Sequence, residues 1–480
     1  MTTRLSLIVA GFLAYGLQIY FYLEGDVIYL IHAAQHLLHG GNYINNFFET
    51  NPPLILYLYF PVILSMQFFK IKLILAVRLY IISLALLSIL ACNYFIKRCQ
   101  LNTRIRLNLL ITITLILLFL PLCEFAQREH LLLIFTLPYW FLVLARIEKA
   151  PIPFFPALLC GISAGLGFAL KPFFLPPLLL TEFYFCLREK STACLFRVET
   201  LCIAGLLSLY ALSLFIFQPD YVQVILPLVS KYYFIGSAET WSTLLDRPPA
   251  LFCLIVALFI PAFCKILRSS TLGFIFSCTL LGFILSFLLP KTAWYYHVLP
   301  ALSLCILLGA LLIAEAPNKL IAGGLIVVFL SIPVVYGLHL FNSEVAIRNN
   351  PALNEVIQLA RAKRIYCLPT HGACSVISAY TQAQYVSRFP SLWVLRGILK
   401  HEPSLEVAQD EDNFLNLLFT DLKTTQPDLV IFDNTVGLPR FKSSQDYLTY
   451  FSRYPKFNRF IKDYRYLKSI GPYEIYIHYT

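Results

Sequence analysis

Long apolar runs fill most of the first 340 residues of this chain, and no other feature limits its fold so strongly. Of its 480 residues, 59% are hydrophobic and only 13% are charged, whereas ordinary soluble domains contain about 25% charged residues. A helix that crosses a bilayer needs about 17–25 mostly apolar residues, and several separate runs are that long. The sequence therefore predicts a polytopic α-helical membrane protein.

The apolar runs predict eleven membrane-spanning helices. Lys171-Pro172 divides the long run 154–187, because proline cannot continue the helical hydrogen-bond ladder and disfavours a helix just before it. The first run is followed by Glu24-Gly25-Asp26 and not by a small-residue cleavage pattern, so we expect it to be retained as a span. The predicted spans are residues 5–23, 73–95, 107–122, 131–145, 154–170, 173–187, 199–217, 249–265, 271–289, 298–313 and 319–338.

The basic residues indicate on which side of the membrane each loop lies, since Lys and Arg collect in cytoplasmic loops. The segment 53–69 is apolar but contains Pro61, so it could cross the membrane or lie at its surface. If it lies at the surface, nearly all short basic loops fall on one side; if it crosses, they scatter over both. We therefore predict interfacial helices in the first loop and a C-terminal domain outside the cytoplasm.

The net charge of +11 belongs mainly to these cytoplasmic loops and does not indicate binding to nucleic acid. Eleven of the thirteen cysteines lie between Cys92 and Cys305, in or beside apolar runs. There they are expected to pack as small hydrophobic side chains. No CxxC motif and no combined Cys and His spacing typical of a zinc site occurs. His32 and His36 have the i, i+4 spacing that can bind a metal, but the exposed face of an interfacial helix explains them as well, so no metal site is assigned.

Residues 340–480 differ from the rest, because their apolar runs are short and alternate with polar helical stretches. The last run, 464–479, predicts a β-hairpin about a Gly-Pro turn. We predict a transmembrane core over 1–339 and a small α/β domain over 340–480. Cys367 and Cys374 lie seven apart in this domain, where an oxidising compartment would permit a disulfide; two free thiols are the alternative.

Under this topology, most of the unusual polar residues fall on the outer face of the membrane. Ionisable groups at a membrane edge are costly, which makes them functional candidates. Their shared side predicts a single extracytoplasmic cavity. The candidates are Glu24, Asp26, Glu49, Asn51, Arg128, Glu129, His130, Lys171, Lys231, Lys291, Tyr296 and His297.

Each candidate also has a structural interpretation. Arg128 and Glu129 could simply pair at the membrane boundary. Lys171 could end a helix and extend its ammonium to the interface. Tyr296 and His297 belong to a Trp-Tyr-Tyr-His run that could form an aromatic belt.

The first loop carries a distinctive pattern: an acidic residue after the first span, a Tyr and an Ala at helical spacing, a Gly-Gly-x-Tyr and an Asn-Pro-Pro-Leu. Its residues are Asp26, Tyr29, Ala33, Gly40, Gly41, Tyr43, Asn51, Pro52, Pro53 and Leu54. This pattern resembles that of the C-type membrane glycosyltransferases, which include the protein O-mannosyltransferase-like family and the lipid A aminoarabinose transferase. The many-span core and the extracytoplasmic tail extend the resemblance to most of the chain.

The resemblance implies an activity and a catalytic residue. In that family the first-loop Asp is catalytic, the donor is a sugar on a polyprenyl phosphate, and transfer takes place outside the cytoplasm. Asp26 is the matching residue, and Tyr29 joins the expected substrate-binding residues. Family members often have Glu directly after the Asp, whereas here Val27 follows and the nearby acid is Glu24. Both Asp26 and Glu24 are therefore catalytic candidates, in a protein expected in a bacterial inner membrane with a periplasmic C-terminal domain.

The chemistry of glycosyl transfer fits these residue types. The reaction displaces phosphate from an anomeric carbon through an oxocarbenium-like transition state. A carboxylate takes the proton of the acceptor, and positive charge is needed where the phosphate leaves. Arginine can bind phosphate through two hydrogen bonds, and lysine acts as a point charge. The cations expected on the outer face are Arg128, Lys171, Lys231, Lys291 and His297.

We therefore predict a glycosyltransferase that moves a sugar from a polyprenyl-phosphate donor to an extracytoplasmic acceptor, which could be a protein, a lipid or a glycan, in contact with membrane lipid. No cofactor is assigned, and the need for a divalent cation stays open. Two other functions compete. A lipid or sugar transporter would be expected to show internal repeats, and an O-antigen polymerase or ligase would favour a long arginine-rich outer loop.

Overall fold

Two compact units make up the computed structural model, which describes residues 2–260, 271–292, 294–316, 318–370, 372–435, 437–439 and 441–479. The helical unit comprises Met1–Phe21, Val77–Ser213 and Glu239–Ser343. The mixed unit comprises Tyr22–Ala76, Leu214–Ala238 and Glu344–Thr480, so the first loop groups with the C-terminal region. The predicted division of the chain at residues 339 and 340 stays a prediction.

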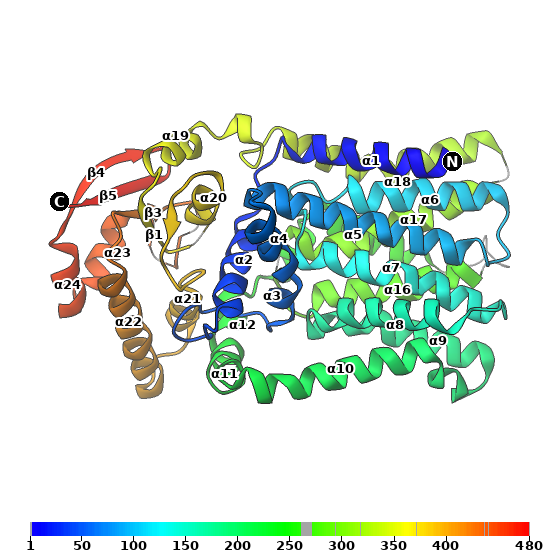
Figure 1. Ribbon diagram of the computed structural model, residues 1–480, viewed down its shortest axis with the longest axis horizontal. Coiled ribbons are helices and arrows are strands. Elements are labelled where there is room, and N and C mark those ends of the chain that lie inside the picture. The colour runs from blue at the N-terminus through cyan, green and yellow to red at the C-terminus, as the bar shows by residue number, and fades with distance from the viewer. Residues whose placement is uncertain are drawn as a thin grey trace. The chain divides into compact units, whose positions relative to one another are not determined.

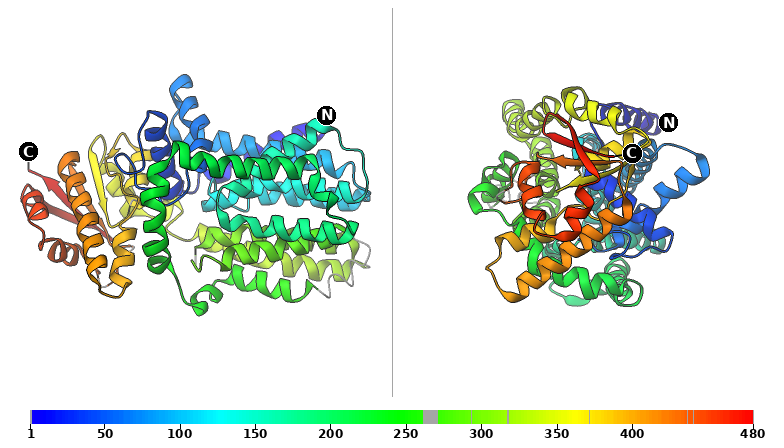
Figure 2. Two further views of the ribbon diagram at one scale, coloured as in Figure 1. Left: turned by 90° about the horizontal axis from the view of Figure 1, so that it is seen from below. Right: turned by 90° about the vertical axis from the view of Figure 1, so that its left-hand side faces the viewer.

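Each predicted span falls on a helix, and the long helices of the helical unit lie side by side (Figures 1 and 2). Among the residues that the structure describes, six helices are long and apolar enough to cross a membrane, and shorter apolar helices accompany them. The count of eleven spans stays a prediction. The helices are α1 Thr2–Gln18, α5 Leu73–Ile96, α6 Thr103–Leu118, α7 Arg128–Ile147, α8 Phe154–Ala169, α9 Leu175–Glu189, α10 Val198–Phe217, α14 Pro248–Leu258, α16 Thr271–Leu288, α17 Leu299–Glu315 and α18 Lys319–Phe341. The end of the predicted span 249–265 lies outside the described residues.

Burial explains why α7 and α17 are apolar on nearly all sides. Most of their residues have almost no exposed surface, which is expected of helices enclosed by other helices.

Close packing also fixes α9 against α16. A Cβ added at Gly282 would lie 2.2 Å from the Cα of Pro177, so only glycine fits there. Short helical turns complete the unit: η1 Leu122–Glu124, η2 Pro172–Phe174, η3 Thr192–Phe196, α13 Trp241–Leu245 and η6 Tyr295–Val298.

The mixed unit is built on a five-stranded sheet of order β2-β1-β3-β5-β4 (Figure 1). Its strands are β1 Arg364–Leu368, β2 Gln384–Tyr385, β3 Leu429–Asp433, β4 Tyr464–Ile470 and β5 Tyr473–His478. β1 pairs in parallel with β2 and β3, and β3 pairs antiparallel with β5 on its other side. β3 lies in the middle of the sheet and is buried along its whole length. β4 and β5 pair antiparallel, which confirms the predicted hairpin.

The helices of the mixed unit come from three parts of the sequence. The first loop supplies α2 Gly25–Leu38, α3 Leu54–Leu58 and α4 Phe60–Phe69. The central part supplies η4 Tyr221–Ile225, α11 Leu226–Leu228, η5 Val229–Tyr233 and α12 Phe234–Ser237. The C-terminal part supplies η7 Ile347–Asn349, α19 Pro351–Leu359, α20 Gly372–Tyr380, α21 Trp393–Lys400, α22 Leu405–Thr425, α23 Ser444–Phe451 and α24 Pro455–Ile461. The segment 53–69 thus groups with the mixed unit, and its place at a membrane surface stays a prediction.

A reporter fused to the C-terminus tests the predicted orientation. Because the basic loops sort to one side only when 53–69 does not cross, we expect a fused alkaline phosphatase to be active and a fused green fluorescent protein to be dark. The same reporters fused after Lys190, in a predicted cytoplasmic loop, should give the opposite result. A cytoplasmic signal at the C-terminus would mean that 53–69 crosses the membrane.

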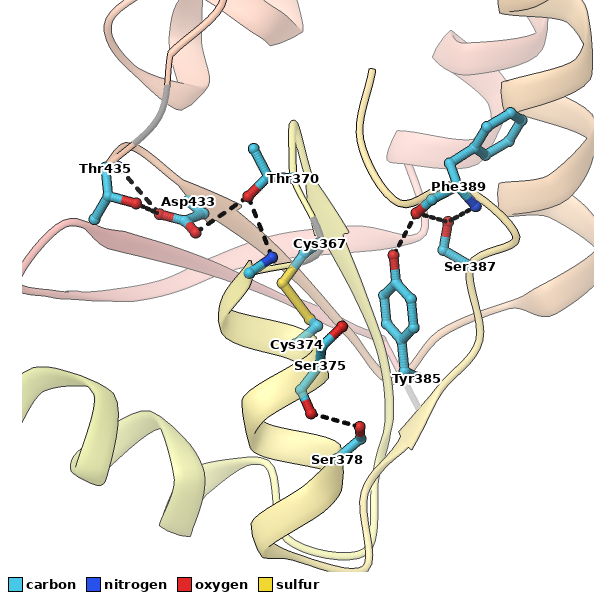
Figure 3. The surroundings of a disulfide bond; sticks show 11 residues. Cys367, Thr370, Cys374, Ser375, Ser378, Tyr385, Ser387, Phe389, Asp433 and Thr435 are labelled. Carbon is cyan, nitrogen blue, oxygen red and sulfur yellow. Dashed lines mark hydrogen bonds between the residues drawn. A yellow bond between two sulfur atoms is a disulfide. The ribbon is translucent and has the colours of Figure 1, made fainter. Parts of the chain in front are cut away.

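Cys367 of β1 and Cys374 of α20 form a disulfide bond (Figure 3). Their Cα atoms lie 5.8 Å apart, which is within the usual range for such a bond. Of the two alternatives that the sequence allowed, a disulfide or two free thiols, the structure contains the disulfide. The other cysteines of the described residues are free thiols.

Replacing Cys367 and Cys374 together by serine is expected to lower the free energy of unfolding by about 2–3 kcal/mol, because the unfolded chain regains the entropy of a loop of about eight residues. Thermal unfolding of the full chain in detergent, with and without reductant, measures the effect. Cys202→Ser, at a half-buried free thiol, is the matched control and should change little. Maleimide labelling of both residues under non-reducing, denaturing conditions would contradict the bond.

Candidate active site

Three charged or polar side chains from distant parts of the helical unit meet at one place. The Nζ atom of Lys171 lies 2.7 Å from Oε1 of Glu129 and 3.3 Å from Nε2 of His297. The same oxygen of Glu129 lies 3.4 Å from Nε2 of His297. The Glu129 side chain is 1% exposed, and those of Lys171 and His297 are 12% and 11% exposed. A largely buried triad is the result.

Local sequence explains how each side chain reaches this place. Lys171 lies in the turn between α8 and η2, where Pro172 prevents α8 from continuing and leaves Lys171 with an extended backbone. Glu129 lies in the first turn of α7, where the helix dipole favours a negative charge. His297 lies in η6, directly before α17.

Two cations of the site share one aromatic ring. The guanidinium carbon of Arg128 lies 5.7 Å, and Nζ of Lys171 5.3 Å, from the centre of the Tyr296 ring. Both distances are in the range of cation–π contacts. We call Arg128, Glu129, Lys171, Tyr296 and His297 the Lys171 cluster.

The tautomer of His297 follows from its two partners. A lysine ammonium can only donate, so Nε2 of His297, which faces Lys171, accepts. The proton is then on Nδ1, which lies 2.9 Å from Oγ1 of Thr292 and donates to it. A neutral imidazole therefore stands beside Lys171.

The Lys171 cluster borders a small pocket that is partly open to solvent. The pocket is lined by Glu129, Lys171, Phe173, Phe174, Ser286, Pro290, His297 and Pro300. The Oε2 atom of Glu129 is buried and has no hydrogen-bond partner among the described residues. Lys171 and Arg128 bring positive charge to the cluster and Glu129 brings a buried carboxylate oxygen, groups that suit a ligand with both an anionic part and a hydrogen-bond donor.

His130 and Lys291, predicted to bind substrate, have other contacts in the helical unit. Both ring nitrogens of His130 are engaged, since Nδ1 accepts from the backbone N–H of Ala126 at 3.2 Å and Nε2 lies 2.8 Å from the carbonyl of Leu117. These bonds favour a structural part for His130. Lys291 lies with Nζ 4.8 Å from the centre of the Trp241 ring.

The two catalytic candidates of the first loop lie at the start of α2 in the mixed unit. Glu24 is the N-cap, and its Oε2 accepts from the backbone N–H of Asp26 at 2.5 Å and of Val27 at 3.3 Å. Asp26 is half-buried in the first turn. The capping function of Glu24 supports a structural part for this residue, and the catalytic part of Asp26 stays a prediction.

Tyr29, Glu49 and Asn51, also predicted to bind substrate, are engaged within the mixed unit. The hydroxyl of Tyr29 donates to the carbonyl of Arg388 at 2.6 Å and accepts from the N–H of Phe48 at 3.2 Å. Burial, with a smaller effect of the nearby Glu49 carboxylate, raises the pKa of Tyr29 well above its ordinary value. Glu49 is buried, and its Oε1 accepts from the backbone N–H of Asn51 at 2.9 Å. These bonds hold the loop in shape, and a contact of these residues with substrate stays a prediction.

Lys231 is paired with carboxylates of α22. Its Nζ lies 2.5 Å from Oε1 of Glu406 and 2.7 Å from Oδ2 of Asp410. Burial lowers the pKa of Lys231, but the hydrogen bonds to Asp410 and Glu406 outweigh it and raise this pKa above its ordinary value. The charge of Lys231 is thus already balanced, which supports a structural part more than phosphate binding.

Sequence reasoning missed Arg388 altogether. Its Nε donates to Oδ1 of Asp421 at 2.8 Å, and its Nη1 donates to the carbonyl of Ile44 at 2.9 Å. Arg388 therefore ties the first loop to α22 across 344 residues of sequence. Among the described residues, no group of three or more His, Cys, Asp or Glu could hold a metal ion.

A bundle of apolar helices combined with a small α/β sheet is the architecture expected of the C-type membrane glycosyltransferases. The fold is similar to that of ArnT from Cupriavidus metallidurans in its apo crystal structure, with a TM-score of 0.54 over 99% of this chain and 98% of that chain. The two sequences are 11% identical, so the likeness concerns the fold. No protein-family model and no curated protein matches the sequence. The family resemblance inferred from the first loop is thus confirmed at the level of the fold.

Proposed function

We propose that the protein is a membrane glycosyltransferase that transfers a sugar from a polyprenyl-phosphate donor to an acceptor outside the cytoplasm. The observation that carries the proposal is the Lys171 cluster, a largely buried group of charged side chains bordering a pocket in a chain with a fold similar to that of ArnT. A lysine that lines a pocket suits an anionic ligand, because its ammonium can donate charge-assisted hydrogen bonds.

The donor has the groups that this site can recognise. Lys171 and Arg128 would bind the phosphate oxygens through charge-assisted hydrogen bonds. The Oε2 atom of Glu129, which has no hydrogen-bond partner in the described part of the chain, can only accept, so a sugar hydroxyl would donate to it. The neutral His297 would hold the ammonium of Lys171 in place without adding charge.

The reaction would exchange one bond for another at the anomeric carbon. An acceptor oxygen attacks this carbon, the bond from the carbon to the phosphate oxygen breaks, and the electron pair leaves with polyprenyl phosphate. Lys171 and Arg128 stabilise the charge that grows on the leaving phosphate. Asp26 takes the proton that the acceptor oxygen loses.

A panel of polyprenyl-phosphate sugars tests the proposal directly. The full-length protein in nanodiscs is incubated with each donor and with lipid, protein and glycan acceptors, and polyprenyl phosphate is detected by mass spectrometry. We expect one donor to release polyprenyl phosphate in an acceptor-dependent manner. Movement of donors across vesicle membranes without any release would instead indicate a transporter.

A further inference from the structure

We propose that the disulfide-closed turn between Cys367 and Cys374 positions Asp26 by supporting the first turn of α2. This inference rests on the proposed function, because it takes Asp26 as the general base. It assigns the turn and Gly25 as positioning elements of the reaction, although none of them needs to touch the substrate.

The turn joins β1 to α20 and is fixed from several sides (Figure 3). The disulfide links Cys367 near the end of β1 to Cys374 in the first turn of α20. The N–H of Gly372 donates to Oγ1 of Thr370 at 3.3 Å, and this hydroxyl donates to Oδ2 of Asp433 at 3.5 Å. The turn is therefore bonded to α20 on one side and to the end of β3 on the other.

The backbone of α2 rests directly on this turn. A Cβ added at Gly25 would lie 3.0 Å from the carbonyl oxygen and 3.3 Å from the Cα of Gly372, which is closer than side chains normally approach a backbone. The close approach therefore favours glycine at position 25, because an added Cβ would push the two backbones apart by a few tenths of an ångström. The next residue is Asp26, so any displacement of the turn is transmitted to the candidate base through a single peptide unit.

Two further contacts hold the ends of this region on α20. The N–H of Leu23 donates to the hydroxyl of Tyr380 at 3.1 Å. Further along α2, Nε2 of His32 lies 3.3 Å from Oγ of Ser378. Contacts on both sides of Asp26 thus fasten α2 to the same helix that the disulfide anchors.

Such support matters because a catalytic group works only in a narrow geometry. A displacement of about 1 Å can cost on the order of 100-fold in rate. The phosphate-binding cations that we propose belong to other segments, in the helical unit. Loosening the turn should therefore lower kcat and leave the KM for the donor unchanged, whereas a general loss of folding would reduce the amount of active protein.

The test combines two variants of the full chain with two measurements. Kinetics use the polyprenyl-phosphate sugar that gives the fastest release, and hydrogen–deuterium exchange follows the amides of residues 26–30. For Cys367→Ser combined with Cys374→Ser, we expect kcat to fall about 10- to 100-fold, the KM to stay constant and exchange in α2 to rise. Gly25→Ala should act in the same direction with the disulfide intact, and helix propensity cannot explain a loss, because alanine favours helices more than glycine does.

Matched controls separate these effects from those of substitution in general. Gly16→Ala in α1 adds a methyl group with nothing within 4 Å, and Cys202→Ser removes a free thiol; neither should change kcat or exchange in α2. Unchanged exchange in α2 in both test variants would overturn the inference, even if kcat fell. A different result, full activity of Asp26→Asn, would contradict the mechanism of the proposed function. Hydrogen–deuterium exchange in α2 would in that case still show whether the turn supports the helix.

Discussion

Asp26→Asn is expected to lower kcat by about 10²–10⁴-fold, with normal expression and unchanged affinity for polyprenyl phosphate. Asparagine has nearly the same size and hydrogen-bonding capacity as aspartate, but it does not take up a proton as a carboxylate does. Release of polyprenyl phosphate under saturating donor measures kcat, and titration with polyprenyl phosphate alone measures binding.

Glu24→Gln is the matched comparison, because it removes the neighbouring carboxylate. Glutamine keeps an oxygen that can accept from the backbone N–H groups of Asp26 and Val27, so the cap of α2 should persist with a modest loss. We expect activity to fall much less than in Asp26→Asn. If Glu24→Gln abolished transfer and Asp26→Asn did not, the two acids would exchange functions, and if neither mattered, the mechanism would be wrong.

The sequence predicted best those features that depend on neighbours along the chain. Apolar runs located the helices, because the hydropathy of a helix depends only on residues that follow one another in the chain. Pro172 marked the break between α8 and α9. The hairpin of β4 and β5 followed from alternation about Gly471-Pro472. The helical spacing of Asp26, Tyr29 and Ala33 in the first-loop motif agrees with the position of Asp26 in the first turn of α2.

Features that depend on distant pairings could not be predicted. Lys171 was expected on the same face as Glu129 and His297, but they lie 42 and 126 residues away, and no local pattern shows that they touch. Lys231 belonged to the same set of cations, yet its partners lie in α22, 175 and 179 residues further along. Only the tertiary structure shows which carboxylates each lysine meets and that Lys171 lines a pocket.

The contacts in the structure also show which of the predicted site residues still have hydrogen-bonding capacity for a ligand. A buried polar group must find hydrogen-bond partners, and those partners reveal whether capacity is left for a ligand. His130 uses both of its ring nitrogens on the backbone, whereas Glu129 keeps one oxygen without a hydrogen bond among the described residues. Two adjacent residues of one sequence motif thus differ in what they can offer a substrate.

Lys171→Met is expected to weaken the binding of polyprenyl phosphate by about 10- to 100-fold, since one hydrogen bond to a charged group contributes about 1.5–3 kcal/mol. The same substitution leaves the carboxylate of Glu129 buried without its closest cation, and breaking a buried ion pair from one side typically costs about 3–5 kcal/mol of stability. A loss of binding in this variant alone could therefore come from a disturbed fold.

The double variant Glu129→Gln with Lys171→Met separates the two causes, because it removes both charges and leaves no unpaired one. We expect it to recover most of the thermal stability of the wild-type protein, since replacing both members of a buried pair is often nearly neutral. Binding of polyprenyl phosphate should stay weak, because the missing ammonium is the one that meets the phosphate. If the double variant instead recovered wild-type binding together with its stability, Lys171 would serve only to balance Glu129, and the phosphate of the donor would have to be bound elsewhere.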